Sequence, residues 1–499
     1  MAILNPTSDF TVKTTNEGYD KTTEDAGDAP LTSTLQHKDS DFSGTLSALN
    51  AEATLVNGVS DITTKSNTQN YFLMTNAPIA SAASFTEGNK PSNFTVTTLA
   101  PITVYNEKAY AEAAASDNPI YVERAVAKTT VKIDVSSGST LTVPNKTNGK
   151  PNPYAGATVE FQGWLLQNTN KKYYPIRNTY TPTHDWNSWL TLFNGSEVNR
   201  FFGETSNPYR TYWGVDPNYT TDIKDDALAE NFNIITIPDG QQPGDNDGLS
   251  WNTLGDNATT EFTGRLVEYC AENTTDVATM ETDQLTGVLL KAKFKPANGG
   301  DNDNLFMINN TSTIFVENGD HGFIAWATAT LANSENQQAH LADGETLSLK
   351  ANAVAGVYVD GTSLKNLLQI KTSSPESTKE LNDAQVNVLI AEAGNNIKFY
   401  KGGVMYYYTT LIAHFGDTET PLGENVIDNS SNYTAAKHLG RWGVLRNNWY
   451  ELNIQSVSGP GEPTIPEIPD EEAPDKTQSY INCEINVLSW TTRQQNVGL

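Results

Sequence analysis

Apolar and polar residues alternate along several stretches of the chain, and a period of two predicts β-strands with one buried face. Clear examples are residues 94–99, 129–135, 157–166, 288–294, 404–412 and 449–457. Clusters of Gly, Pro, Asn and Asp separate them, as turns require. Two short segments, 106–116 and 221–232, have the composition of helices instead. The pattern predicts a mainly β fold with sandwich-like domains, long loops and a few short helices.

Length and charge narrow the classes of protein. The 499 residues allow two or three domains. The 32 Lys and Arg residues against 59 Asp and Glu residues give a net charge of −27, which disfavours nucleic acid and anionic membranes as partners. No apolar run reaches the roughly 18 residues of a membrane span, and residues 1–4 lead into polar sequence rather than a signal peptide. We therefore expect no membrane insertion in the mature form.

The two cysteines, Cys270 and Cys483, exclude a disulfide framework and a zinc site built on Cys ligands. A single disulfide in an exported protein and two free, buried thiols both fit this count.

Catalytic motifs are absent from the sequence. It has no G-x-S-x-G, P-loop, dinucleotide-binding or H-E-x-x-H motif. The six histidines are scattered without metal-ligand spacing: His37, His184, His321, His340, His414 and His438. We expect packing or surface roles for them, no cofactor and no enzymatic activity. A polysaccharide enzyme stays an alternative, because sequence does not reveal how far apart two carboxylates lie.

Two Asp-rich turns resemble the beginning of a calcium-binding loop. One contains Asp245 and Asp247, and the other contains Asp301 and Asp303. Neither has the bidentate Glu that such a loop places at its twelfth position. Turn formation explains Asp, Asn and Gly equally well, so we expect no metal site.

Aromatic residues offer a second possibility for ligand binding. Tyr406, Tyr407 and Tyr408 are consecutive in a predicted strand, where a stacking platform is conceivable but a core strand is preferred. Four tryptophans without regular spacing, Trp186, Trp189, Trp213 and Trp251, could line a sugar-binding groove, although packing is again preferred.

Residues 459–476 are rich in proline and acidic residues. They contain Pro460, Pro463, Pro466, Pro469 and Pro474, a density that excludes a helix or a central strand and favours polyproline II. At about 3.1 Å per residue the segment could reach roughly 50 Å. A surface loop and an interdomain linker both fit.

The last twenty residues, 480–499, follow this segment with strand-like alternation. They provide one or two strands, which is too little for a domain. Because a lone strand leaves its backbone N–H and C=O groups unpaired, it must return to its own sheet or complete the sheet of another molecule.

Four places in the chain are similar to one known family. They are residues 70–78, 121–135, 210–219, and the C-terminal series formed by 440–454, the Pro-rich segment and 480–490. The chain resembles the type V fimbrial subunits (fimbrilins) of Bacteroidetes, most closely the shaft subunit of Mfa-type fimbriae. Residues 1 to about 65 lack the family's first strand, and the lipoprotein Cys is missing. In this family the precursor is lipidated and then cut after an Arg, which removes the first strand. The first arginine here is Arg124, which is consistent with a chain that begins after this cut.

The resemblance implies two transthyretin-like β-sandwich domains. We expect an N-terminal domain over residues 1–178 with an acceptor groove, a C-terminal domain over 179–458, a linker over 459–476 and a donor strand region over 477–499. Loss of the first strand would open the groove, and the C-terminal strand of a neighbour would fill it by strand addition. The expected buried donor residues are Ile481, Cys483, Ile485, Val487, Trp490, Val497 and Leu499.

The function implied is that of a self-polymerising fimbrial shaft subunit that supports adhesion and biofilm formation. Its implied place is extracellular, on a fimbria attached to the outer membrane, with a lipoprotein precursor. Its partners would be further copies of itself, anchor and tip accessory subunits, and host or bacterial surface ligands. The alternative is a tip or surface adhesin that binds a glycan or protein.

Overall fold

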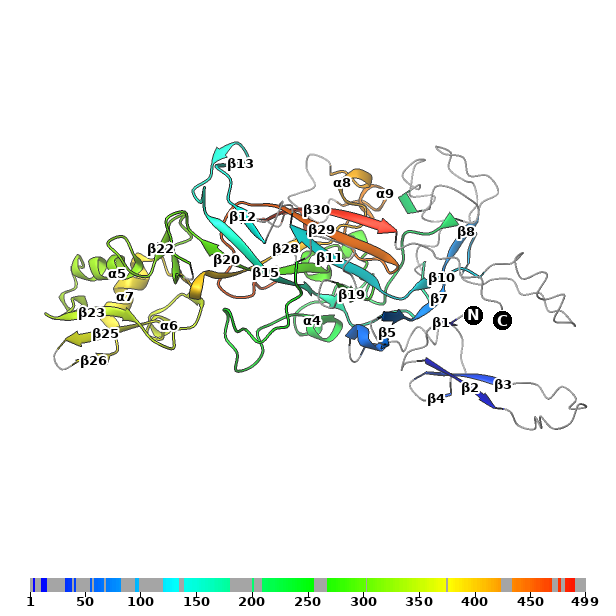
Figure 1. The fold of residues 1–499 in the computed structure, drawn as a ribbon, viewed down its shortest axis with the longest axis horizontal. Helices are drawn as coiled ribbons and strands as arrows, with labels where there is room; N and C mark the ends of the chain where they lie inside the picture. The colour runs from blue at the N-terminus through cyan, green and yellow to red at the C-terminus, as the bar shows by residue number, and fades with distance from the viewer. Residues whose placement is uncertain are drawn as a thin grey trace, which may run out of the picture.

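The structure is a computed structural model that describes residues 3–4, 10–15, 32–37, 40–41, 54–55, 58–66, 69–81, 95–97, 120–133, 139–179, 200–201, 209–254, 267–301, 303–373, 376–422, 433–468, 474–476 and 481–489. Its elements confirm the prediction of a mainly β protein with short helices. The ribbon is elongated, with a sandwich near its middle and a smaller lobe at one end (Figure 1).

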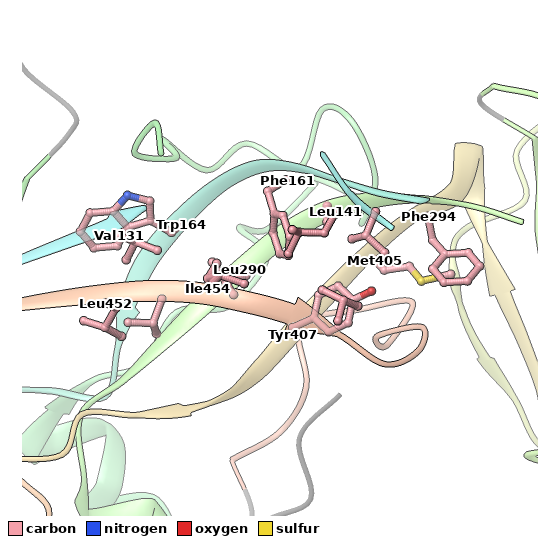
Figure 2. Packing of buried hydrophobic residues seen from close by; sticks show 14 of the residues in the cluster. Val131, Leu141, Phe161, Trp164, Leu290, Phe294, Met405, Tyr407, Leu452 and Ile454 are labelled. Atoms are coloured by element: carbon pink, nitrogen blue, oxygen red, sulfur yellow. The ribbon is translucent and has the colours of Figure 1, made fainter. Parts of the chain in front are cut away.

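Two four-stranded sheets form the sandwich. One has the order β19 (Glu268–Cys270), β11 (Ala127–Ile133), β29 (Asn448–Val457) and β30 (Ile481–Ser489). The other has the order β12 (Thr140–Thr142), β15 (Thr158–Gln167), β20 (Gly287–Lys295) and β28 (Val404–Leu411). Their facing side chains share one hydrophobic core, which includes Val131 and Leu452 from the first sheet and Leu290 and Tyr407 from the second (Figure 2).

Strand β29 shows how the sequence pattern produces this packing. Tyr450, Leu452 and Ile454 are buried, while Glu451 and Asn453 between them are part exposed. This period of two places every second side chain in the core and leaves the alternate ones at the surface. Burial of apolar area in this way contributes roughly 25 cal/mol per Å².

The lobe lies between β20 and β28 in the sequence, although these two strands are paired neighbours. It contains the sheet β22 (Ile314–Val316), β21 (Leu305–Ile308), β27 (Ile397–Tyr400) and β24 (Gly356–Tyr358), and the sheet β23 (Glu345–Leu349), β25 (Leu368–Ser373) and β26 (Glu376–Lys379). Helices α5 (Phe323–Ala332), α6 (Gly361–Leu364) and α7 (Asp383–Glu392) complete it. Phe306 stacks on Phe323 and Phe399 in a core of its own.

Small sheets from the first part of the chain lie at the opposite end of the sandwich (Figure 1). They are β1 (Ile3–Leu4), β7 (Met74–Asn76) and β10 (Val122–Arg124); β17 (Tyr209–Arg210), β8 (Ile79–Ser81) and β9 (Thr95–Thr97); β2 (Phe10–Thr15), β3 (Thr32–His37) and β4 (Ser40–Asp41); and β5 (Thr63–Ser66) with β6 (Gln69–Phe72). We call them the N-terminal sheets.

Short elements fill the connections. These are β13 (Lys146–Thr147), β14 (Lys150–Pro151), β16 (Thr169–Asn170), β18 (Phe232–Asn233), α4 (Asp226–Asn231), α8 (Gly416–Glu419) and α9 (Ala435–His438). Among the described residues, no helix has the length and apolar character needed to cross a membrane.

Two buried ion pairs lie beside the junction of the N-terminal sheets and the sandwich, because Glu123 is in β10 while Glu272 and Arg446 lie next to β19 and β29. Arg177 Nε lies 3.0 Å from Glu123 Oε1, and Arg446 Nη2 lies 2.7 Å from Glu272 Oε1. All four side chains are at most 1% exposed. Removing one partner would leave a buried charge unpaired, which typically costs about 3–5 kcal/mol, so these pairs hold the junction in one arrangement.

The predicted strands all have counterparts, and α4 corresponds to the helix predicted over 221–232. The helix predicted over 106–116 lies outside the described residues. The domain boundary expected between residues 178 and 179 is wrong for the sandwich, because β11 pairs with β29 and β15 pairs with β20. Local periodicity does not show which distant strands pair in one sheet, so it does not locate a boundary of this kind.

A glycine in β15 allows the loop at residues 251–252 to pair with this strand. A Cβ built on Gly163 would lie 2.5 Å from Trp251 Cβ and 3.1 Å from Asn252 O, whereas one on Gly356 in β24 meets nothing within 4 Å. We expect Gly163→Ala to lower the free energy of unfolding by about 1–3 kcal/mol through overpacking. Gly356→Ala is the control and should change it by less than about 0.5 kcal/mol in denaturant titrations. Equal effects of the two substitutions would contradict the close contact.

Candidate functional site

The C-terminal strand β30 is paired with its own subunit. It runs antiparallel to β29 at the edge of the first sheet, from Val457 opposite Ile481 to Asn448 opposite Ser489. Four expected donor positions therefore belong to the parent sheet in this structure. Ile481, Cys483, Ile485 and Val487 are in register with Val457, Ile454, Leu452 and Tyr450, all of which are buried. Trp490, Val497 and Leu499 lie outside the described residues.

The neighbouring strand β29 is fixed on its other side by β11. The two strands are parallel, from Lys128 opposite Trp449 to Ile133 opposite Ile454. Lys132 Nζ lies 2.7 Å from Glu451 Oε1, and Trp449 Nε1 donates to Thr130 Oγ1 at 2.8 Å. These cross-strand contacts give β30 a rigid edge to pair with.

The first part of the Pro-rich segment is packed against the second sheet. We call residues 459–468 the strap. Tyr407 Oη donates to Gly459 O at 3.2 Å, and Tyr400 Oη donates to Gly461 O at 3.1 Å. The backbones of Tyr406 and Glu462 exchange two hydrogen bonds of 2.9 Å. The strap thus lies along the edge of β28, bridged at Tyr406 and Glu462, and also contacts β27. The expected extended linker with a reach of roughly 50 Å is wrong over these residues.

Gly461 is needed at this contact. A Cβ on it would lie 2.5 Å from Tyr406 O, so a larger residue would push the strap off β28. Lys398 Nζ adds an ion pair at 2.8 Å to Glu462. The three consecutive tyrosines are all buried, which confirms the core interpretation over a ligand-stacking platform.

Farther along the same segment, Asp475 is held by several donors, and we call this arrangement the clamp. Its carboxylate accepts hydrogen bonds from Arg441 Nε at 2.9 Å, Trp442 Nε1 at 3.1 Å and Tyr433 Oη at 2.5 Å. The side chains of Asp475 and Arg441 are 6% and 4% exposed. Burial alone would raise the pKa of Asp475, but the hydrogen bonds from Arg441, Tyr433 and Trp442 outweigh it and lower the pKa below its ordinary value.

Sequence analysis missed the clamp. Arg441 and Trp442 lie more than thirty positions before Asp475, and a single Asp among prolines and glutamates looks like any surface residue. The one available signal was the short run Arg441–Trp442 inside a segment that resembled the fimbrial family.

In the first Asp-rich turn, the carboxylate of Asp247 stabilises the fold through an ion pair and hydrogen bonds. Asp247 Oδ2 lies 2.8 Å from Lys291 Nζ, with both side chains at most 5% exposed, and it also accepts from Trp251 Nε1 and Tyr406 Oη. A shallow hollow of about 350 Å³ beside Asp247 is lined by Gln241, Asp245, Asn246, Gly248, Leu249 and Trp251. Within the described residues no group of three or more His, Cys, Asp or Glu side chains could hold a metal ion.

The second Asp-rich turn is held in the same way. Asp301 pairs with Lys295 at 2.8 Å, and Asp303 Oδ2 accepts from Gly300 N at 2.6 Å. Both contacts stabilise the turn itself and confirm its interpretation as a turn.

Two carboxylates have a pKa raised to about 7, chiefly by burial. Asp216 accepts from the backbone N–H groups of Thr274 and Asn218, each at 2.6 Å, and Glu268 accepts from Leu166 N at 2.9 Å. Because backbone donors occupy these groups, we assign them to loop and strand geometry rather than to proton transfer.

The tryptophans and histidines in the described residues are mainly packed. Trp213 is fully buried and Trp251 is part exposed, while Trp186 and Trp189 lie outside the described residues. His184 also lies outside them, and His37 is in β3. His321 is exposed, His340 is part exposed, and His414 and His438 are buried.

The two cysteines belong to opposite edges of one sheet. Cys270 is in β19, buried and free, and burial raises the pKa of its thiol. Cys483 is in β30, three strand spacings away. At about 4.8 Å per spacing the Cα atoms are at least roughly 14 Å apart, beyond the roughly 7 Å limit for a disulfide. An intramolecular bridge is therefore excluded in this arrangement.

Comparisons with known proteins agree with the C-terminal resemblance. Residues 398–496 match the family model of the major fimbrial subunit protein type IV, Fimbrillin, C-terminal. This range contains β28, β29, the strap, the clamp and β30. The resemblance to fimbrial subunits is thereby confirmed for the C-terminal fifth of the chain.

Among solved structures, the chain is similar to one described as a "putative cell adhesion protein" from Parabacteroides distasonis ATCC 8503. The identity is 12%, and the match covers 77% of this chain but 60% of the other, at a TM-score of 0.23. A TM-score this low supports no argument about function. No curated protein matches the sequence.

His414 supports β29 from within the core and titrates there. Its Nε2 donates to Tyr212 O and its Nδ1 accepts from Tyr450 Oη, both at 2.8 Å. Burial lowers the pKa of His414 from 6.5 to about 4, so the unfolded chain takes up this proton first. Stability from the neutral ring is present above pH 6.5 and is lost as the pH falls from 6.5 toward 4.

We expect the free energy of unfolding of the wild type to fall by about 2–3 kcal/mol more than that of His414→Gln between pH 7 and pH 4. The raised pKa values of Asp216 and Glu268 act in the opposite direction, but they cancel in this difference because both chains contain them. Denaturant titrations at several pH values measure it. Parallel profiles for the two proteins would contradict the burial of a neutral His414.

Proposed function

We propose that this chain, which carries the C-terminal region of a fimbrillin, is a structural subunit of a bacterial cell-surface fimbria. The match of residues 398–496 supports the fimbrial role. We further propose that it polymerises head-to-tail by donor-strand exchange. The supporting observation is the position of β30, an edge strand that β29 alone pairs with among the described strands and that residues 490–499 follow directly.

In this proposal β30 remains in its own sheet, and residues 490–499 cross to the next subunit. Removal of β30 would unpair the edge of β29 along nine residue pairs. Residues 490–499 follow the last pair, Asn448 with Ser489, so their transfer breaks none of the described strand pairs of the sandwich. Ten extended residues span about 33 Å, enough for one strand. Trp490, Val497 and Leu499 then become the apolar residues of the donor.

The proposed acceptor is the edge of β7 in the N-terminal sheets. There β1 covers Thr75 and Met74, and it is two residues long. Leu73 and Phe72 next to this edge belong to a small buried core. A donor that takes the place of β1 would gain main-chain hydrogen bonds. Val497 and Leu499, which are two positions apart and so share one face of a strand, would set the register.

Donor and acceptor are different surfaces of the subunit. A contact of this kind does not close on itself and generates an open filament. A tail that can be donated favours a shaft subunit over a tip adhesin, because a tip subunit has no further subunit to enter.

The wider setting follows from the same family. We propose an extracellular fimbria attached to the outer membrane, a lipoprotein precursor, and anchor and tip accessory subunits as partners. Adhesion to host or bacterial surfaces and biofilm formation would be the result of assembly, without turnover of a substrate.

Deletion of residues 490–499 tests the donor. We expect a folded monomer with an unchanged melting temperature, because the deletion removes no described contact of the sandwich. It should form no filaments in negative-stain electron microscopy and no SDS-resistant ladder, in contrast to the full chain. Filaments as abundant as those of the full chain would overturn the assignment of this segment.

A disulfide between β29 and β30 tests which part of the tail moves. Glu451 and Asn486 are directly opposite each other, at a spacing suited to a disulfide. We expect Glu451→Cys with Asn486→Cys, in a Cys483→Val background, to form filaments equally well when oxidised and when reduced. Mass spectrometry confirms the crosslink. Assembly that is blocked by oxidation and restored by reduction would instead mean that β30 itself is exchanged.

A further inference from the structure

The connection into β30 is unusual for two antiparallel neighbours. Such strands are commonly joined by a hairpin of a few residues, whereas β29 and β30 are separated by residues 458–480. This connection passes through the strap on the second sheet and through the clamp before β30 pairs with the first sheet. No tight turn therefore specifies that β30 pairs with its own β29.

The strand itself does not distinguish its own subunit from another copy. A β30 from a second molecule would offer β29 the same register and the same backbone hydrogen bonds. Reciprocal exchange would produce a closed, domain-swapped dimer, which is a low-cost route for edge elements on long connections. Such a dimer competes with an open filament.

The clamp shortens the connection between the last fixed contact of the chain and β30. From the end of the strap to β30 the chain has twelve residues, 469–480, and from the clamp it has five, 476–480. Effective concentration falls roughly as the −3/2 power of tether length, so fixing Asp475 favours self-pairing about fourfold. The buried hydrogen bonds of Asp475 also fix the direction in which the chain leaves.

We infer that the clamp of Asp475 by Arg441, Trp442 and Tyr433 retains β30 in its own subunit and so suppresses strand-swapped dimers. Asp475 is a positioning residue in this role, because it acts on β30 through the chain. The inference rests on the proposed function in one respect: retention of β30 is what leaves residues 490–499 as the part that crosses.

The burial and bonding of the clamp suit this role. Arg441 contacts Asp475 through Nε and Nη2, and its Nη1 donates to Thr420 O at 2.7 Å. Trp442 packs in the same apolar cluster as Tyr433, together with Ile465 and Ile468 of the strap. A change at Asp475 therefore disturbs one end of the connection and leaves the β29 strand unchanged.

Hydrogen exchange on the full-length monomer tests the inference. We expect Asp475→Asn to raise amide exchange of residues 481–489 at least fourfold, with residues 448–457 in β29 unchanged. The control is Asp383→Asn, which breaks the 2.7 Å ion pair with Lys365 in the lobe, outside the clamp and away from β30. It should leave exchange in 481–489 at the wild-type rate. Wild-type exchange of this segment in Asp475→Asn would overturn the inference.

Size-exclusion chromatography with light scattering provides the second measurement. The full chain with Asp475→Asn should form more dimer than the wild type, and Arg441→Lys, which keeps the charge but loses the planar contact, should do the same. Dimer at the wild-type level in both variants contradicts the inference. These outcomes are separate from those for fimbrial assembly, because exchange and dimer formation are measured whether or not the wild type forms filaments.

Discussion

The parallel pairing of β11 with β29 is the constraint on which the rest of the structure depends. It joins residues more than three hundred positions apart and makes the sandwich a product of both ends of the chain. β11 supplies one side of β29, and the free side is then available to β30. A hydrogen bond of 3.2 Å from Arg124 Nη1 in β10 to Asn447 Oδ1, just before β29, connects the N-terminal sheets to this arrangement. The proposed acceptor edge and the C-terminal strand are therefore set by one assembly of strands.

Strands could be predicted from the sequence because their signal is local. The alternation in residues 449–457 and 288–294 identified β29 and β20 almost to the residue. The division into domains could not be predicted in the same way, because the sequence of a strand does not show which distant strand it pairs with. Helix α5 has apolar residues on nearly all sides, so it has little helical periodicity to detect.

The contacts of the C-terminal segment could not be predicted from the sequence either. In its described residues the prolines allow no strand and only a 3-10 turn at Pro474–Lys476, yet they did not show that the hydroxyls of Tyr400 and Tyr407 bind its carbonyl groups. The contact of Asp475 with Arg441 was equally hidden, because a carboxylate is assigned to the surface until its donors are known. Polar contacts between distant segments are what turn a predicted linker into part of the packed structure.

The lobe between β20 and β28 has one more consequence. Its chain leaves and re-enters the sandwich through two strands that lie side by side, so its ends are already close together. A short turn could replace the whole lobe without cutting a sheet, and another module with adjacent ends could be grafted in its place. If subunits repeat along a fimbria, this position is a regularly spaced attachment point whose content evolution or a designer can vary while the shaft stays the same.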